Sequence, residues 1–191
     1  MPDLILASAS PRREELLKQV GLSFDIVPGR VDEEAVRAAS PKRLVERLAY
    51  LKARSVSLQE PSLPVLGADT VVALGDKILG KPKSPRQALM MLACLQGKPH
   101  RVYTGVALVH GQRDRAAVGS EMTRVWMRPL TLDELKTYVA TGEPRGKAGS
   151  YAIQGMGGGL ISRIEGCYFN VVGLPLALTV KMLKTFGVNA F

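Results

Sequence analysis

Three Ser-Pro pairs, each followed by a basic residue, divide the chain into segments of different type. The pairs begin at Ser10, Ser40 and Ser84. Serine accepts a hydrogen bond from a free amide at a helix start, and proline suits the first helical position. A helix is therefore predicted after each pair, and apolar runs such as residues 4–7 are predicted to be buried strands.

The rest of the chain alternates strands and helices in the same irregular way. Further strands are predicted at 64–74, 101–110 and 116–127, further helices at 131–140 and 174–186, and a glycine-rich loop at 155–159. The polar residues 111–114 form the turn between two paired strands. We expect an α/β fold with a mixed sheet flanked by helices, formed by one domain over residues 1–191.

The charge of the chain limits its class of partner. Its formal net charge is +9, while aromatic residues make up only 5%. A thinly spread basic surface is either simply solvated or suited to polyanions. Because no basic-aromatic motif of a single-strand binding platform is present, a phosphorylated metabolite is favoured over a nucleic acid.

Cysteine and histidine are scarce, with Cys94, Cys167, His100 and His110 as the complete set. They offer no spacing for a structural zinc site and no disulfide framework. The first residues lack the pattern of a signal peptide, and the apolar stretches are too short to span a bilayer. We therefore expect a cytoplasmic protein that does not act at a membrane.

Two segments nearly match nucleotide-binding motifs. Residues 75–82 follow the P-loop pattern until Pro82, where a Ser or Thr hydroxyl is needed for magnesium. Residues 155–160 resemble the dinucleotide fingerprint, but Leu160 stands where the third glycine belongs. Neither a P-loop enzyme nor a nicotinamide enzyme is expected.

The segment from Ser8 to Arg13 is the first candidate site. It lies between a predicted strand and a helix start, where free backbone amides favour an anion. Arg12 and Arg13 oppose the helix dipole there, and a bound anion would remove that conflict. The alternative is plain helix capping, since the chain uses Ser-Pro at its other helix starts too.

Asp69 is the second candidate, because it interrupts an apolar, strand-like run. A carboxylate there costs several kcal/mol to desolvate unless it is paired or binds a metal. It is a structural ion pair, a metal ligand or a general base.

Four further residues are weaker candidates, because each also has an ordinary structural explanation. Glu33 either adds a second carboxylate to a metal site or belongs to a solvated acidic cluster. Lys52 and Lys81 are either site residues or solvated lysines, and Gln154 either reads a base edge or occupies a turn. Carboxylates together with several cations suggest metal-assisted attack on phosphorus.

A series of short segments then carries a family resemblance along the whole chain. They are Leu-Ala-Ser-Ala-Ser-Pro-Arg-Arg at 6–13, Val-Asp-Glu at 31–33, Leu-Ala-Tyr-Leu-Lys-Ala at 48–53, Gly-Ala-Asp-Thr at 67–70, Gly-Lys-Pro at 80–82, Lys-Ala-Gly-Ser-Tyr-Ala-Ile-Gln-Gly at 147–155 and Val-Val-Gly-Leu-Pro-Leu at 171–176. In this order they resemble the Maf family of nucleoside triphosphate pyrophosphatases. The resemblance implies a single elongated domain related to the inosine triphosphate pyrophosphatases, with a cleft between two lobes.

The resemblance also implies an activity: hydrolysis of a nucleoside triphosphate to a monophosphate and pyrophosphate, with Mg²⁺ or Mn²⁺. It marks Asp69 as the proton acceptor and, with Glu33, as a metal ligand. The residues that would bind phosphate are Ser8, Arg12, Arg13, Lys52 and Lys81. It also suggests a homodimer, and neither a nucleic acid nor a membrane as a partner.

Arg12, Thr70 and Gln154 fall where the branches of the family differ. This combination resembles the branch that acts on dTTP and UTP, whereas the 7-methyl-GTP branch tends to carry Trp, Gln and Glu there. A small Thr and an amide suit a pyrimidine with an imide edge, while an aromatic and an acid suit a methylated, cationic purine. The alternatives are 7-methyl-GTP hydrolysis and a nucleotide-sensing regulator of cell division with little turnover.

Overall fold

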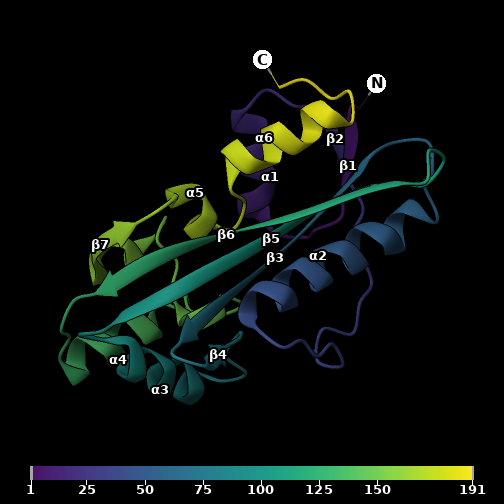
Figure 1. Cartoon of the computed structure of the whole chain (residues 1–191). Helices are drawn as coiled ribbons and strands as arrows, with labels where there is room; N and C mark the ends of the chain where they lie inside the picture. The colour runs from purple at the N-terminus through teal and green to yellow at the C-terminus, as the bar shows by residue number, and fades with distance from the viewer. Residues whose placement is uncertain (1, 191) are drawn as a thin grey trace. The chain divides into compact units, whose positions relative to one another are not determined.

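The computed structural model describes residues 2–190 and contains one mixed β-sheet (Figure 1). In sheet order, the strands are β2 (Phe24–Ile26), β1 (Leu4–Leu6), β3 (Val65–Leu74), β5 (Pro99–His110), β6 (Arg115–Met127) and β7 (Ile161–Glu165), with β4 (Lys77–Leu79) paired to β3. Strand β1 runs parallel to β2 and β3, whereas β4 and β7 run antiparallel to their neighbours. The predicted α/β class with a mixed sheet is confirmed.

The helices begin close to where the sequence places them. They are α1 (Pro11–Gln19), α2 (Pro41–Ser57), α3 (Pro85–Leu95), α4 (Leu132–Ala140), α5 (Tyr168–Val172) and α6 (Leu176–Thr185), with the short 3₁₀ helices η1 (Ala148–Ser150) and η2 (Met156–Leu160). All three Ser-Pro pairs start a helix, as predicted. The side chains of Ser40 and Ser84 accept hydrogen bonds from their helices, whereas the side chain of Ser10 makes no such bond within the described chain.

Two predictions about glycine-containing segments have different outcomes. The segment 155–159, expected to be a loop, is largely the 3₁₀ helix η2, in which the amide of Gly158 donates to the carbonyl oxygen of Gly155. The rejection of a P-loop is confirmed: Gly75 has a φ of 59° in the tight turn between β3 and β4, so this segment is a β-hairpin. Strands β2, β4 and β7 and helix α5 were not predicted, since each is short and, unlike the equally short β1, none is fully buried.

The described chain divides into two compact units, and strands β3, β5 and β6 contribute residues to both. The first unit comprises residues up to Asp69, Thr104–Glu121 and the residues from Gly173 onward. The second unit comprises Thr70–Tyr103 and Met122–Val172. Within residues 2–190, no helix combines the length and the apolar composition needed to cross a bilayer.

In the first unit, helix α2 covers one face of the sheet, and α1 and α6 cover the other (Figure 1). The strands carry glycine where α2 crosses them. A Cβ on Gly67 would lie 2.2 Å from the carbonyl oxygen of Ala49, and one on Gly105 would lie 2.3 Å from that of Val45. Helix α2 therefore lies directly on the strand backbones, and its own residues Ala49 and Ala53 are fully buried.

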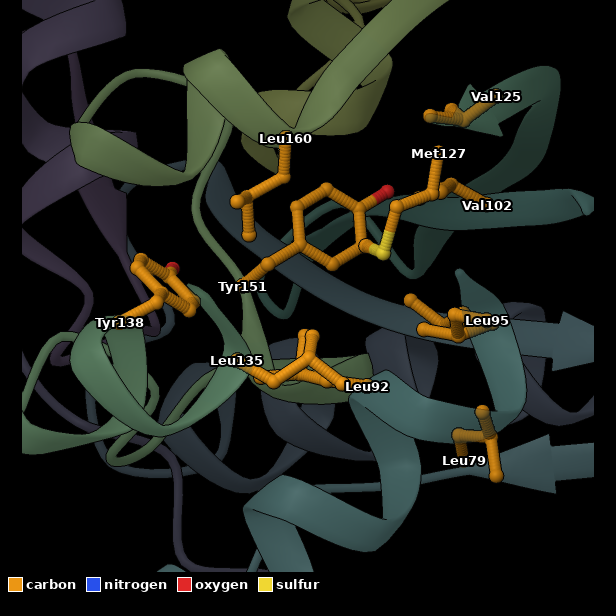
Figure 2. Close-up of a cluster of buried hydrophobic side chains, with 11 residues drawn as sticks. Leu79, Leu92, Leu95, Val102, Val125, Met127, Leu135, Tyr138, Tyr151 and Leu160 are labelled. Carbon is orange, nitrogen blue, oxygen red and sulfur yellow. The ribbon is translucent and has the colours of Figure 1, made fainter. Parts of the chain in front are cut away.

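In the second unit, α3, α4 and the segment after α4 surround a core centred on Tyr151. Figure 2 shows the Tyr151 ring among aliphatic side chains, including those of Leu92 and Leu160. The hydroxyl of Tyr151 lies 2.7 Å from Nε2 of buried His100. Apolar packing thus fixes the residues that precede Gln154.

Candidate active site

Asp69 and Lys52 form a buried ion pair in the first unit. The Nζ atom of Lys52 lies 2.6 Å from Oδ1 of Asp69, and these residues are 8% and 6% exposed. The contact depends on α2 lying close to β3, which Gly67 permits two residues before Asp69. The cation offsets the desolvation of a carboxylate held in an apolar strand.

The carboxylate of Glu33 joins the same ammonium group. Its Oε1 lies 2.6 Å from Lys52 Nζ, so the two acidic oxygens are no farther apart than twice that distance. Gly29 permits the approach, because a Cβ there would lie 2.7 Å from the carbonyl oxygen of Lys52. Two carboxylates from distant segments therefore converge on one cation.

Arg13 lies at the start of α1 and is 9% exposed. Its Nη1 donates to Oγ of Ser8 at 3.0 Å, and its Nε donates to the carbonyl oxygen of Gly173 at 2.9 Å. These bonds fix the direction of the guanidinium. Gly173 is a contact that the residue pattern did not reveal, although its segment belongs to the family resemblance.

The charge of Arg13 interacts with those of the two carboxylates. Burial lowers the pKa of Arg13, the negative charge of Asp69 opposes that change, Arg12 adds to it, and Glu33 again opposes it. A group of opposite charges therefore surrounds this arginine. The structure thus brings together, in the first unit, the predicted site residues Ser8, Arg12, Arg13, Glu33, Lys52 and Asp69.

The remaining predicted site residues, Thr70, Lys81 and Gln154, belong to the second unit. The amide of Gly149 donates to the carbonyl oxygen of Gly80, which ties the segment before Lys81 to the segment before Gln154. A Cβ on Gly149 would lie 2.8 Å from the side chain of Val72. Thr70 lies on the same face of β3 as Val72, because side chains two residues apart share a strand face.

The carboxylates of the first unit are the side chains that could bind a metal ion. Among residues 2–190, no group of three or more His, Cys, Asp or Glu side chains is placed to hold one. Magnesium, however, is commonly held by one or two carboxylates, with substrate phosphates and water completing the shell. Asp69 and Glu33, which already share one cation, fit that kind of site.

Known proteins resemble this chain over nearly its whole length. A family model described as Maf-like protein matches residues 3–186. A protein of Symbiobacterium thermophilum named dTTP/UTP pyrophosphatase is 53% identical over 100% of this chain and 97% of its own length. Proteins with the same name from Moorella thermoacetica and Bacillus pumilus are 51% and 47% identical, each over 100% of this chain and over 98% and 100% of their own lengths.

Proposed function

The chain belongs to the Maf family, and on that premise we propose that it is a dTTP/UTP pyrophosphatase. It is a hydrolase that converts a nucleoside triphosphate to the monophosphate and pyrophosphate. One structural observation supports the assignment above the others: Lys52 joins the buried carboxylate of Asp69 to that of Glu33. Opposite charges gathered in this way are what a polyanionic substrate and its counter-ion require.

In the proposed reaction, water attacks a phosphorus of the anhydride bridge between the α and β phosphates. The new P–O bond forms while the bridging P–O bond breaks, and pyrophosphate leaves. Asp69 takes the proton from the attacking water as general base. Ser8, Arg12, Arg13, Lys52 and Lys81 bind the phosphates, and the cations among them offset the charge that develops on the oxygens.

Asp69 and Glu33 are the proposed ligands of a divalent cation, Mg²⁺ or Mn²⁺. Such an ion would neutralise phosphate charge and polarise the bond that is cut. The Lys52 ammonium contacts both carboxylates, which limits the repulsion between them.

Arg12, Thr70 and Gln154 are the proposed selectors of the base. The amide of Gln154 can donate to the O4 atom of uracil or thymine and accept from N3–H, a pattern that cytosine reverses. We place the reaction in the cytoplasm, where Cys94 and Cys167, both free in the structure, would stay reduced. The homodimer implied by the resemblance is part of the same proposal, and light scattering would test it.

A substrate panel tests the proposal. Purified protein is incubated with Mg²⁺ or Mn²⁺ and each of dTTP, UTP, CTP and 7-methyl-GTP, and pyrophosphate release is measured. Release from dTTP and UTP above the others is expected. Brisk release from 7-methyl-GTP alone would instead assign the chain to the other branch.

A regulator that senses nucleotides is the other alternative, and it would share the same residues. Titration calorimetry with dTTP separates the two, because tight binding with negligible turnover would favour the regulator. Measurable turnover that disappears on chelation of the divalent cation supports the enzyme.

A further inference from the structure

Gln154 lies in an exposed turn of the second unit. The amide of Gly155 donates to the carbonyl oxygen of Ala152 at 3.2 Å, which places Gln154 third in a four-residue turn. A long, exposed side chain on a turn loses rotamer entropy when it reads a base. Its ability to discriminate therefore depends on how firmly the backbone on either side is held.

The residue before the turn is held by Tyr138 of α4. The amide of Ala152 donates to the Tyr138 hydroxyl at 3.2 Å, and that hydroxyl donates to Oε1 of Glu143 at 2.8 Å. Tyr138 is 5% exposed and belongs to the same buried cluster as Tyr151, which Figure 2 shows. The hydroxyl is thus a rigid anchor point for the backbone.

The residues after the turn are held by Glu143. Its Oε2 accepts from the amide of Met156, and its Oε1 accepts from the amide of Gly157, both at 2.8 Å. These amides open the 3₁₀ helix η2 and would otherwise have no partner within that helix. One carboxylate thus holds the backbone that follows Gln154.

The backbone after Gln154 lies very close to these side chains. A Cβ on Gly155 would lie 2.2 Å from Oε2 of Glu143, so the carboxylate would have to leave its present position. A Cβ on Gly157 would lie 2.6 Å from the Tyr138 hydroxyl and 2.7 Å from the carbonyl oxygen of Ala152, so only glycine fits at position 157. The backbone of Glu143 is itself held, because Thr141 accepts from the Glu143 amide and donates to the carbonyl oxygen of Tyr138.

The charge state of Glu143 fits this arrangement. Burial would raise the pKa of Glu143, but the hydrogen bonds from the Gly157 amide, the Tyr138 hydroxyl and the Met156 amide, with the charge of Lys147, lower it overall. The side chain is therefore an anion at neutral pH, which suits a group that accepts several hydrogen bonds at once.

We propose that Tyr138 and Glu143 are positioning residues for base selection, which hold the turn that carries Gln154 by its two ends. The proposal rests on the proposed function, since it assigns these residues to the recognition of uracil or thymine. Neither side chain contacts the substrate in this scheme. Their effect reaches the base only through Gln154.

Two conservative variants test the proposal. Tyr138→Phe removes the hydroxyl but keeps the ring, and Glu143→Gln keeps the shape but turns one acceptor into a donor that faces an amide. Each should reduce the preference for UTP over CTP, measured as the ratio of kcat/KM values, about tenfold, which is the worth of roughly one hydrogen bond. The loss should lie mainly in KM for UTP, with kcat changed about twofold or less.

Thr131→Ala is the matched control, because it removes the N-terminal cap of the same helix without touching the turn. It should lower stability and leave the UTP-to-CTP ratio unchanged. If Tyr138 and Glu143 act through Gln154, neither variant should lower the ratio further in a Gln154→Ala background. A further tenfold loss in that background would overturn the proposal.

Hydrogen exchange gives a readout that does not depend on activity. The amides of Met156 and Gly157 should exchange faster in Glu143→Gln than in the wild type, and at the wild-type rate in Thr131→Ala. Faster exchange with an unchanged UTP-to-CTP ratio would show that the pair is merely structural.

Failure of the proposed function would look different from failure of this inference. An enzyme that releases no pyrophosphate from any of the triphosphates contradicts the proposed function. In that case the affinities for UMP and CMP are compared by calorimetry in the same variants. A UMP preference that survives Tyr138→Phe and Glu143→Gln unchanged would refute the positioning role.

Discussion

The two units use polar groups in opposite ways. The first unit buries full charges, with Lys52, Asp69 and Arg13 each less than 10% exposed. The second unit fixes its polar groups through hydrogen bonds between tyrosine, histidine and the backbone, with Glu143 as the one anion at the turn. The first unit thus has a group of buried charges, and the second has hydrogen bonds that hold its backbone.

The difference has a physical reason. Charges held out of water interact strongly with a phosphate chain and with a cation, but charge alone carries little information about shape. Hydrogen bonds are directional, whether the acceptor is a neutral oxygen or, as at Glu143, a carboxylate, so they hold a turn in one geometry. In the proposed function, the buried charges of the first unit therefore act on the phosphates, and the held turn of the second unit acts on the base.

The largest effect is expected for Lys52→Met in the ionic group. The change leaves the carboxylates of Asp69 and Glu33 near each other without the cation that joins them. Breaking a buried pair in this way should lower the free energy of unfolding by about 3–5 kcal/mol. Urea unfolding measures this loss of free energy. Lys18→Met is the control, because Lys18 forms an exposed ion pair with Glu14. Equal losses in the two variants would contradict the paired role of Lys52.

Asp69→Asn should have the next largest effect, on rate rather than on stability. The amide keeps a hydrogen-bond acceptor for Lys52 but is no longer a base. A loss of ~10² or more in kcat is expected, with a far-ultraviolet circular dichroism spectrum like that of the wild type. Glu165→Gln is the matched control, because it also removes one carboxylate, but from an exposed side chain of β7. This variant should have the kcat of the wild type. Wild-type turnover in folded Asp69→Asn would remove Asp69 from the mechanism.

A pH experiment tests the neutral network of the second unit. Burial lowers the pKa of His100 from 6.5 to about 4, so the unfolded chain takes up this proton first as the pH falls. The stability that a neutral His100 provides is complete above pH 6.5 and is lost as the pH falls from there toward 4. Lowering the pH from 7 to 5.5 should therefore remove roughly 1 kcal/mol of unfolding free energy.

His100→Gln is the reference for that experiment, because an amide can bond to Tyr151 but does not titrate. The difference in unfolding free energy between the wild type and His100→Gln should shrink between pH 7 and pH 5.5. A constant difference would mean that His100 is protonated in both states or in neither.

The smallest effect is expected at the Ser-Pro helix starts, of which Ser10 lies in the first unit and Ser84 in the second. Ser84 caps α3 through a bond from the Gln87 amide at 3.2 Å, whereas Ser10 makes no capping bond to α1 within residues 2–190. Ser84→Ala should cost about 1 kcal/mol of unfolding free energy, and Ser10→Ala only a few tenths. Thermal unfolding of both variants measures this. A larger cost for Ser10 would contradict the distinction.

The positions of the long elements could be predicted because they depend on local patterns. The N-terminal box of α4, formed by Thr131 and Glu134, is read from two residues three apart, and both of its bonds are present. Ser84 and Gln87 have the same spacing, but only one of the two bonds forms there. The side chain of Ser84 accepts from the Gln87 amide, whereas Gln87 accepts from the amide of Lys83 rather than from that of Ser84.

The candidate site was predictable as a set of residues but not as a set of contacts. An acidic residue inside an apolar strand is conspicuous in the sequence, and the family resemblance indicates the residues that accompany it. Nothing local marks the carbonyl oxygen of Gly173 as a partner of Arg13, 160 residues away. Glu143 was likewise overlooked, since an acid after a helix ordinarily faces solvent.

The sequence by itself determined the class of fold, the starts of the main helices and the requirement that Asp69 be compensated. These follow from side-chain period, capping chemistry and the cost of desolvating a charge. Only the tertiary structure decided which cation compensates Asp69 and which side chains hold Gln154. Those choices depend on the close approach of α2 to Gly67 and of Glu143 to Gly155, and a close approach is a property of packing between distant segments, which no short stretch of sequence encodes.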